Sequence, residues 1–511
     1  MYGRVTGVAV VGIEGHLIQV EAHVGRGLPA LALTGLPGAG VQDARERVRP
    51  AVEGSGLEWP LRRVTINLSP ADLRKEGPGF DLPVAMAVLA ACSQVKQDRL
   101  ERHVLFGELS LTGALVRTPG VLAVAVAAVR AGMAGVIVPE ANAPEAALVG
   151  GLEIVGAPSL ARVTDFLRGE WRPPSPNPGA SEAREDGVDL AEVRGQAAAR
   201  RAFEVAAAGG HNLLVVGPPG AGKTMLARRL PTILPALDRE EALEVTRLHS
   251  VAGLLPAGAG LVGHRPFRNP HHTVSPAGLL GGGSGFLRPG EVSLAHHGVL
   301  FLDEVTEVRH DALEGLRQPL EEGRVVITRA SGTVAFPARF TLVAAANPCP
   351  CGYQGDPRRR CECLPHRVLH YRQKLSGPLL DRIDLRLSVP RLTRAELMGS
   401  AQGEASAAVR ARVEAARERG RARLAGTPFH ANGQMPGSLA RRTVRLTGAA
   451  RELLAGAVDA LALSGRGFDR ALRVARTVAD LAGSGTVEAD HLAEALAYRA
   501  DDRVGAPAGA A

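Results

Sequence analysis

A glycine-rich stretch, GPPGAGKT (217–224), offers the most specific chemistry in the sequence. It joins the short apolar run HNLLVV (211–216) to the helix-like KTMLARRL (223–230), the setting that the pattern GxxxxGK[ST] requires. Backbone N–H groups of such a loop bind phosphates, with Lys223 reaching the β- and γ-phosphates and Thr224 ligating Mg²⁺. The predicted ATP-binding residues are Gly217, Pro218, Pro219, Gly220, Ala221, Gly222, Lys223 and Thr224.

An acidic pair supplies the second half of this predicted site. In HHGVLFLDEV (296–305) an apolar strand ends in Asp303 and Glu304. An aspartate at this point can hold Mg²⁺ together with Thr224, and a glutamate can act as a general base on water. We therefore predict that Glu304 is catalytic, so that ATP is hydrolysed and not only bound.

Two more polar residues are predicted to complete the catalytic site. Asn347 ends the apolar strand FTLVAAANP and can position the attacking water. Arg382 follows a tight turn in GPLLDRIDL, and we predict that it is an arginine finger supplied to a neighbouring subunit. An ion pair within the chain, with Asp381 or Asp384, is the alternative.

An arginine of the C-terminal region is a further candidate. Arg470, in GFDRALRVART, can reach the γ-phosphate of its own chain. Arg466 and Arg473 lie close by in the sequence and compete for the same role.

The elements that must position these residues are arranged as consecutive units. Residues 1–170 alternate strand-like and helix-like patterns, which predicts an α/β domain, and the Pro-rich residues 171–187 are typical of a linker. A second α/β unit, 188–390, holds every nucleotide signal. Residues 391–505 are rich in good helix formers, which predicts a helical domain, and 506–511 form a disordered tail.

Composition limits the classes of partner. The net charge of +8 and the pI near 9.7 favour a polyanionic partner, and aromatic residues at 3% disfavour base stacking as the mode of contact. Only four of the sixty Lys and Arg residues are lysines, and one of the four is Lys223. The sequence shows no signal peptide and no apolar run of membrane-spanning length, so we expect a cytoplasmic protein without membrane association.

The order of these motifs resembles that of AAA+ ATPases, and longer segments resemble the magnesium-chelatase-like AAA+ family of the ComM/YifB type. These segments are PFRNPHHTVSPAGLLGGGSGFLRPGEVSLAHHGVLFLDEV, ARFTLVAAANPCPCG, LSGPLLDRIDL and RALRVARTVADLAG, and the resemblance covers essentially the whole chain. It implies an AAA+ P-loop α/β core with a C-terminal α-helical lid domain. It also implies a homo-hexameric ATPase acting on single-stranded or branched DNA, with recombination proteins as partners. ComM-type members promote branch migration during natural transformation.

The family also carries a Lon-protease-like N-terminal domain, which LRKEGPGFDLPVAMAVLAA resembles. The residue at the position of the Lon nucleophilic serine is Gly79, and the position of the Lon lysine falls near Leu122. Without a hydroxyl nucleophile and its base, acyl transfer has no chemistry to run on. We therefore expect a protease fold without protease activity.

A long basic segment is the first candidate for DNA contact. Residues 247–289 contain no Asp or Glu and carry Arg265, Arg268, His271 and His272 beside a glycine-rich stretch. In the pore of a ring, a loop without carboxylates suits a phosphate backbone. A glycine-rich surface loop is the alternative interpretation of the segment, and metal binding is the alternative for the two histidines.

A predicted β-hairpin is the second candidate. RVVITRASGTVAFPARF (324–340) turns around residues 330–333 and carries three arginines. A hairpin that only caps the sheet is the alternative. The predicted DNA-binding residues of the two segments are Arg265, Arg268, His271, His272 and Arg329.

Four of the five cysteines form the pattern C-x-C, nine residues, C-x-C: Cys349, Cys351, Cys361 and Cys363. Four thiolates suit tetrahedral Zn²⁺, although C-x-C is a less usual spacing than C-x2-C. We expect either a structural zinc site, dispensable for the chemistry, or reduced thiols in a loop.

Function is predicted as an ATP-driven DNA motor that promotes branch migration or strand exchange. The alternatives are a magnesium-chelatase-type motor subunit and an AAA+ ATPase that remodels proteins, because pore loops alone do not identify their polymer.

Overall fold

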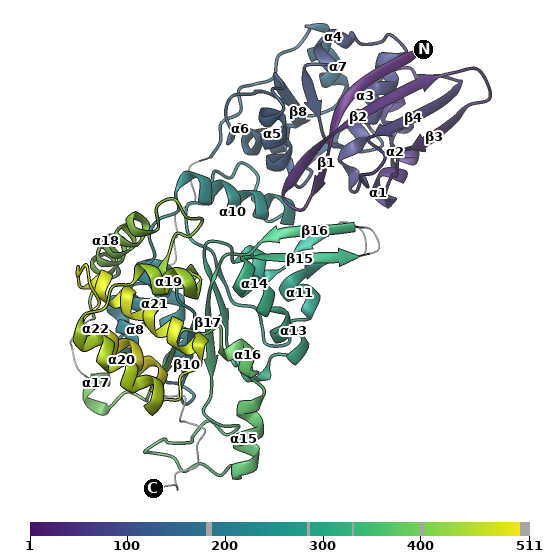
Figure 1. Cartoon of the computed structure of the whole chain (residues 1–511). Helices are drawn as coiled ribbons and strands as arrows, with labels where there is room; N and C mark the ends of the chain where they lie inside the picture. Colours follow the sequence, from purple (N-terminus) through teal and green to yellow (C-terminus); the bar gives the residue numbers. More distant parts are fainter. Residues whose placement is uncertain (180–186, 284–286, 330–331, 399–402, 501–511) are drawn as a thin grey trace.

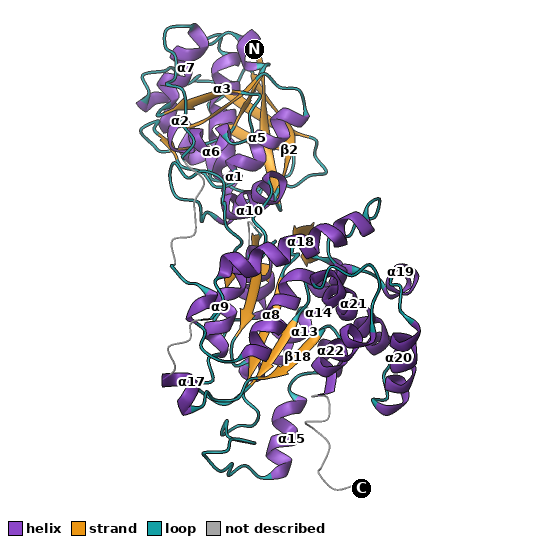
Figure 2. Cartoon of the chain, turned by 90° about the vertical axis from the view of Figure 1, so that its left-hand side faces the viewer, coloured by secondary structure: helices purple, strands orange, loops and turns teal. Residues whose placement is uncertain are grey.

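The computed structural model describes residues 1–179, 187–283, 287–329, 332–398 and 403–500 (Figure 1). An N-terminal α/β unit lies at one end of the molecule, next to a second α/β unit. Helix α10 (Arg239–Ala252), which belongs to the second unit by its position in the sequence, lies between the two. The C-terminal helices cover one side of this second unit (Figure 2). The predicted tail and residues 180–186 of the predicted linker lie outside the described residues.

The N-terminal unit is built on a seven-stranded mixed sheet in the order β3-β4-β2-β1-β5-β8-β9. Helix α3 is buried along its whole length, which explains its uniformly apolar sequence LPVAMAVLAA. The strands are β1 (Tyr2–Val11), β2 (Glu14–Val24), β3 (Ala30–Thr34), β4 (Arg63–Ser69), β5 (His103–Leu105), β8 (Gly135–Pro139) and β9 (Glu153–Ala157). The main helices are α2 (Ala44–Gly54), α3 (Asp81–Ala91), α5 (Val121–Arg130), α6 (Ala143–Ala147) and α7 (Leu160–Arg168).

The second unit holds a five-stranded sheet in the order β11-β14-β17-β10-β18, in which every neighbouring pair is parallel. Because the strands are parallel, their carboxyl ends meet at one edge of the sheet and their amino ends at the other. The strands are β10 (Leu213–Val216), β11 (Phe267–Arg268), β14 (Val299–Leu302), β17 (Thr341–Ala346) and β18 (Leu385–Ser388). Helices α8 (Ala197–Gly209) and α9 (Lys223–Ile233) flank strand β10 in the sequence.

The C-terminal helices share one apolar core with helix α8 and strand β10. A buried polar contact adds to this attachment: Nδ1 of His211 lies 2.9 Å from Asp384, and Nε2 lies 2.8 Å from the hydroxyl of Thr477. The helices are α18 (Ser406–Leu424), α19 (Gly437–Thr443), α20 (Gly448–Ala460), α21 (Gly465–Leu481) and α22 (Ala489–Ala500). The predicted layout, two α/β units followed by a helical C-terminal region, is confirmed. None of the helices formed by the described residues has the length and apolar character that a membrane crossing needs.

Where the N-terminal unit and the second unit meet, each buries an apolar side chain in an apolar cluster of the other. Ile13, in the turn between β1 and β2, is buried in the apolar cluster of the second unit, and Val251 of α10 is buried in a cluster of the N-terminal unit. Arg247 of α10 forms an ion pair of 2.9 Å with Glu14. The two units therefore form one continuous body.

The predicted hairpin is present as β15 (Arg324–Arg329) and β16 (Gly332–Pro337), with Arg329 opposite Gly332. Gly12 of the N-terminal unit lies against its middle, because a Cβ atom there would be 2.9 Å from the carbonyl oxygen of Ala335. Figure 1 shows the end of strands β1 and β2 directly above this hairpin.

Candidate active site

The glycine-rich loop leads from the carboxyl end of β10 into the first turn of α9. Gly217 has no room for a side chain, because a Cβ atom would lie 2.3 Å from the carbonyl oxygen of Val389. Gly222 has φ +85° and immediately precedes helix α9, which begins at Lys223. Only glycine meets both demands without strain. The remaining loop residues are Pro218, Pro219, Gly220 and Ala221.

Lys223 lies at the centre of the loop. Its ammonium group donates to the carbonyl oxygens of Gly217 (2.6 Å) and Pro218 (3.2 Å) and to Oδ1 of Asn347 (3.0 Å). Asn347 follows the last residue of β17, so the parallel register places it beside the loop, as predicted. Burial lowers the pKa of the Lys223 ammonium group, and the nearby carboxylates oppose that shift. All three N–H donors of Lys223 are thus taken up by oxygen atoms of the loop and of Asn347.

The two predicted magnesium ligands are in contact. The hydroxyl of Thr224 donates to Oδ2 of Asp303 at 2.7 Å, across the gap between α9 and the end of β14. One hydroxyl and one carboxylate on neighbouring elements form the kind of partial oxygen shell that Mg²⁺ completes with water and phosphate. The residues present therefore fit Mg²⁺.

Glu304 is exposed and has φ +46°, a left-handed conformation that is rare for a residue with a side chain. Its carboxylate lies 3.3 Å from Nδ1 of His272. His272 was predicted to bind DNA, and in this structure it lies beside the candidate general base instead. The sequence carries no signal for this pair, because the two residues lie on separate loops.

Arg382 lies at the opposite edge of the sheet from the loop. It precedes β18, whose amino end pairs with the amino end of β10, and β10 has four residues and is about 13 Å long. Its guanidinium donates to the carbonyl oxygen of Pro378 at 2.6 Å and forms an ion pair with Glu321. The in-chain partner is therefore neither Asp381 nor Asp384.

Arg470 does not reach the nucleotide loop of its own chain, which contradicts the prediction. It is only 2% exposed and donates to Asp381 at 3.0 Å and to the carbonyl oxygens of Leu380 and Ile383. These partners belong to the amino edge of the sheet, next to Arg382. Arg470 therefore fixes the turn that carries Arg382. Its two predicted competitors lie near the same turn, since Arg466 is 3.7 Å from Asp381 and Arg473 is 3.6 Å from Asp384.

Two of the predicted DNA contacts serve the fold instead. Arg265 is only 7% exposed and donates to the carbonyl oxygen of His297 (2.8 Å) and to Glu241 (2.9 Å). Arg268 forms a two-bonded ion pair with Glu291, at 2.6 and 2.8 Å. A charge pattern free of carboxylates within 247–289 does not exclude carboxylate partners from elsewhere in the chain.

Other basic side chains of these segments remain exposed. His271 and Arg329 lie at the surface, as does Arg288, which follows a glycine-rich stretch. The ribbon β12 (Gly281–Gly282) and β13 (Arg288–Pro289) lies near the hairpin, because a Cβ atom on Gly282 would be 3.8 Å from the guanidinium of Arg329. Arg288 and Arg329 are therefore two exposed arginines on neighbouring ribbons.

The position of the Lon nucleophile is filled in the N-terminal unit. A Cβ atom on Gly79 would lie 2.2 Å from the ring of Phe106, so no side chain fits there. Leu122 is fully buried, and its backbone N–H donates to Glu145 at 3.0 Å. Neither position offers a nucleophile or a base.

We expect no peptidase activity from this unit, and none from Gly79→Ser either. The added side chain would collide with Phe106 and lower the free energy of unfolding by about 1–3 kcal/mol, as overpacking usually does. Thermal denaturation measures the first effect, and cleavage of labelled casein with and without ATP measures the second. Steady cleavage by highly purified protein would overturn this prediction.

Comparison with known proteins gives three family matches: residues 189–397 match magnesium chelatase subunit ChlI, 20–142 match subunit ChlI of Mg-chelatase, and 403–499 match the C-terminal part of subunit ChlI. The chain is 43% identical to YifB of Escherichia coli over 498 residues, 97% of this chain and 96% of that protein. It is 41% identical to the competence protein ComM of Haemophilus influenzae over 500 residues, 96% of each.

The N-terminal unit has a further relative. The chain is 31% identical to the Lon protease of Mycolicibacterium smegmatis over 151 aligned residues, which cover 28% of this chain and 19% of that protein. A Lon-like N-terminal unit, a parallel P-loop sheet and C-terminal helices together agree with the ComM/YifB resemblance inferred from the sequence. The chain belongs to the magnesium-chelatase-like AAA+ family of the ComM and YifB type.

Proposed function

We propose that this protein is an ATP-driven motor that assembles as a homo-hexameric ring and moves single-stranded or branched DNA, promoting branch migration or strand exchange with recombination proteins as partners. The observation that carries the proposal is the separation of the catalytic groups. Lys223, Asp303, Glu304 and Asn347 lie at the carboxyl edge of the sheet, and Arg382 lies at the amino edge. A site completed by a neighbour makes hydrolysis depend on assembly.

Each residue has a defined role in hydrolysis. The Glu304 carboxylate accepts a proton from water, and the Asn347 amide orients that water. Lys223 and the backbone N–H groups of the loop offset the charge of the phosphates. Thr224 and Asp303 would hold Mg²⁺, which neutralises charge on the transferring group.

Arg382 acts in this scheme on the nucleotide of the adjacent subunit. Its ion pair with Glu321 is therefore the resting arrangement, exchanged for the γ-phosphate on assembly. Charge that develops on the phosphate in the transition state is the target of such an arginine.

The DNA assignment draws on the relative named a competence protein and on the exposed arginines of the two ribbons. Arg288 and Arg329 carry fixed positive charge at the surface, which suits phosphates and conveys little base information. A chelatase-type motor subunit and a protein-remodelling ATPase share the same ATP site, so the choice depends on the polymer that stimulates turnover.

We expect Arg288→Ala/Arg329→Ala to weaken DNA binding at all sequences alike. Each arginine–phosphate interaction removed should flatten the log–log dependence of affinity on salt by roughly 0.7–0.9, so the double variant should flatten it by roughly 1.4–1.8. Fluorescence anisotropy with single-stranded and four-way-junction DNA over a salt series measures this change. Arg62→Ala, at an exposed arginine of the N-terminal unit, is the control and should keep the wild-type slope.

Strand exchange tests the motor itself. Wild-type protein with ATP should exchange the strands of a synthetic three-strand or four-way junction, and Lys223→Ala should not. If the double arginine variant binds junctions as tightly as wild type and no junction moves, the DNA assignment fails. Stimulation by a partner protein that inserts a metal into a porphyrin, or by an unfolded protein, would then identify the alternative.

A further inference from the structure

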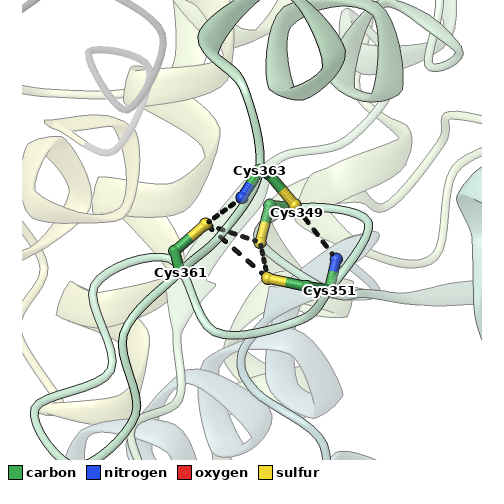
Figure 3. Close-up of side chains that lie close together, drawn as sticks. All are labelled: Cys349, Cys351, Cys361 and Cys363. Atoms are coloured by element: carbon green, nitrogen blue, oxygen red, sulfur yellow. Dashed lines mark hydrogen bonds between the residues drawn. The ribbon is translucent and has the colours of Figure 1, made fainter.

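The segment between strand β17 and helix α15 (Pro365–Gln373) brings Cys349, Cys351, Cys361 and Cys363 together (Figure 3). Their sulfur atoms all lie within 4.8 Å of one another, and three separations are 3.4, 3.6 and 3.6 Å. A tetrahedral zinc ion with Zn–S bonds of about 2.3 Å holds its sulfurs about 3.8 Å apart. All four side chains are free thiols. The arrangement is therefore that of a tetrathiolate metal site.

Backbone N–H groups support the sulfur atoms. The amide of Cys351 donates to Sγ of Cys363 at 3.3 Å, the amide of Gln354 to Sγ of Cys349 at 3.3 Å, and the amide of Cys363 to Sγ of Cys361 at 3.4 Å. Such donors stabilise thiolate charge and orient the ligands of a metal. The loop therefore supplies the outer contacts as well as the four ligands.

A second group of metal-ligand residue types behaves differently. Glu244, His296 and His297 converge, with Nε2 of each histidine 2.9 Å from Glu244. Nδ1 of His296 accepts from the backbone N–H of Arg339 at 2.9 Å, and burial lowers the pKa of His296 to about 4. A neutral ring whose Nδ1 accepts carries its proton on Nε2, so that nitrogen donates to Glu244 and offers a metal no lone pair. This group is a hydrogen-bonded support, and of the two groups found among the described residues the cysteines are the one suited to a metal.

The cysteine loop touches the phosphate-binding loop. Gly352 directly follows Cys351 and has φ +84°, and its amide donates to the carbonyl oxygen of Cys349 at 2.9 Å. A Cβ atom on Gly352 would lie 2.6 Å from Cδ of Pro219 and 3.9 Å from Cγ of Asn347. The backbone at Gly352 therefore supports both a loop residue and the residue that bonds Lys223.

Helix α15 ties the other end of the cysteine loop to the same site. Arg372 donates to the carbonyl oxygen of Pro348 at 3.4 Å and to the side chain of Gln354 at 3.0 Å. Just after the helix, Lys374 lies 3.2 Å from Glu307, three residues beyond Glu304. A metal that orders the cysteine loop would therefore also order the nucleotide site in two places, at the contacts of Gly352 and at the contact of Lys374 with Glu307.

We propose that Cys349, Cys351, Cys361 and Cys363 bind one Zn²⁺, and that the metal holds Pro219 and Asn347 in the conformation that receives ATP. Metal binding closes a loop that has few apolar side chains of its own, so the binding energy orders the loop. The zinc site is therefore needed for tight nucleotide binding, which goes beyond a dispensable structural role. Of the proposed function, this inference depends only on ATP binding at the nucleotide site, and it does not depend on any contact with DNA.

Metal content tests the first half of the proposal. The full-length protein, purified with zinc and freed of loose metal by gel filtration, should hold one zinc per chain by elemental analysis. Cys361→Ser/Cys363→Ser should lose it, and Cys92→Ser, at the cysteine outside the cluster, should keep it. Cobalt in place of zinc should give the visible absorption of a tetrahedral thiolate site. Protein without zinc, or equal zinc in the double variant, would overturn the metal site.

Paired glycine variants test the coupling. Gly352 and Gly355 both have positive φ, at +84° and +77°, but only Gly352 has a neighbour within 4 Å of an added Cβ. Gly352→Ala should keep its zinc and bind a fluorescent ATP analogue about tenfold more weakly, whereas Gly355→Ala should bind it within about twofold of wild type.

Removing zinc from wild-type protein with a chelator should weaken ATP binding in the same way, and zinc should restore it. Unchanged affinity after full zinc loss, together with wild-type affinity of Gly352→Ala, would overturn the coupling. Failure of DNA stimulation would leave these outcomes untouched, so the two proposals are tested separately.

Discussion

Arg382→Ala is expected to lower ATP turnover of the assembled protein by roughly 10³-fold or more, the effect of losing an arginine finger, while ATP binding changes little. The guanidinium lies at the amino edge of the sheet, across the strands from Lys223. It is held there by Pro378 and Glu321, and Arg470 fixes its turn. At this edge the guanidinium lies away from the nucleotide loop of its own chain, and the proposal assigns it to the nucleotide of a neighbouring subunit.

Mixing experiments separate this role from a structural one. Equal mixtures of Arg382→Ala and Lys223→Ala subunits should regain activity, because about a quarter of the interfaces in a random ring join an intact loop to an intact arginine. Glu321→Gln is the matched control, since it removes the in-chain partner and keeps the arginine. Mixtures that exchange subunits freely and yet stay inactive would argue against the finger.

Glu304→Gln is expected to retain ATP binding while turnover falls by roughly 10²-fold or more. The amide keeps the size and hydrogen-bonding reach of the carboxylate but cannot take a proton from water. Glu304 is exposed, two residues beyond the end of β14 and next to Asp303, the proposed metal ligand. These features suit a base and give the residue no role in the core.

The measurement is single-turnover hydrolysis together with binding of a fluorescent ATP analogue. Glu53→Gln provides the control, because this exposed glutamate lies in the N-terminal unit and pairs with Arg49 of the same helix. Wild-type turnover in Glu304→Gln would remove the residue from the mechanism. Loss of nucleotide binding in the same variant would indicate a structural defect.

The parts of the nucleotide site were predictable because each is carried by a short local pattern. An apolar run followed by glycines and Lys223, and another ending in Asp303 and Glu304, predict strand ends. Parallel pairing then places them at one edge, which the structure shows. Local patterns and one rule of sheet geometry are therefore enough to bring these residues together.

The positions of the arginines were harder to predict from the sequence, because their partners are distant in the sequence. Arg265 is held by carbonyl groups and by Glu241, which lies 24 positions earlier, and nothing in 247–289 signals this contact. Arg470 was assigned to the wrong edge because its place depends on how α21 packs against the amino end of β18. Charge and spacing do not encode such packing.

Strands β3 and β9 lie at the two ends of the N-terminal sheet, and no pattern in the sequence was assigned to either of them. Both strands are only five residues long, and only one residue of β3 is buried. Edge strands take much of their stability from pairing with a neighbour, and a single sequence does not reveal that pairing.

The contact of Gly12 with the middle of the β15–β16 hairpin has a mechanical consequence. A hairpin that is fixed only at its base can bend along its whole length, like a cantilever. A contact at its middle shortens the part that is free to bend. Bending stiffness rises steeply as free length falls, so the half that carries Arg329 resists deflection far better than the same ribbon unsupported. A load applied at Arg329 would pass through Ala335 into the β1–β2 turn, and the N-terminal unit would serve as its brace.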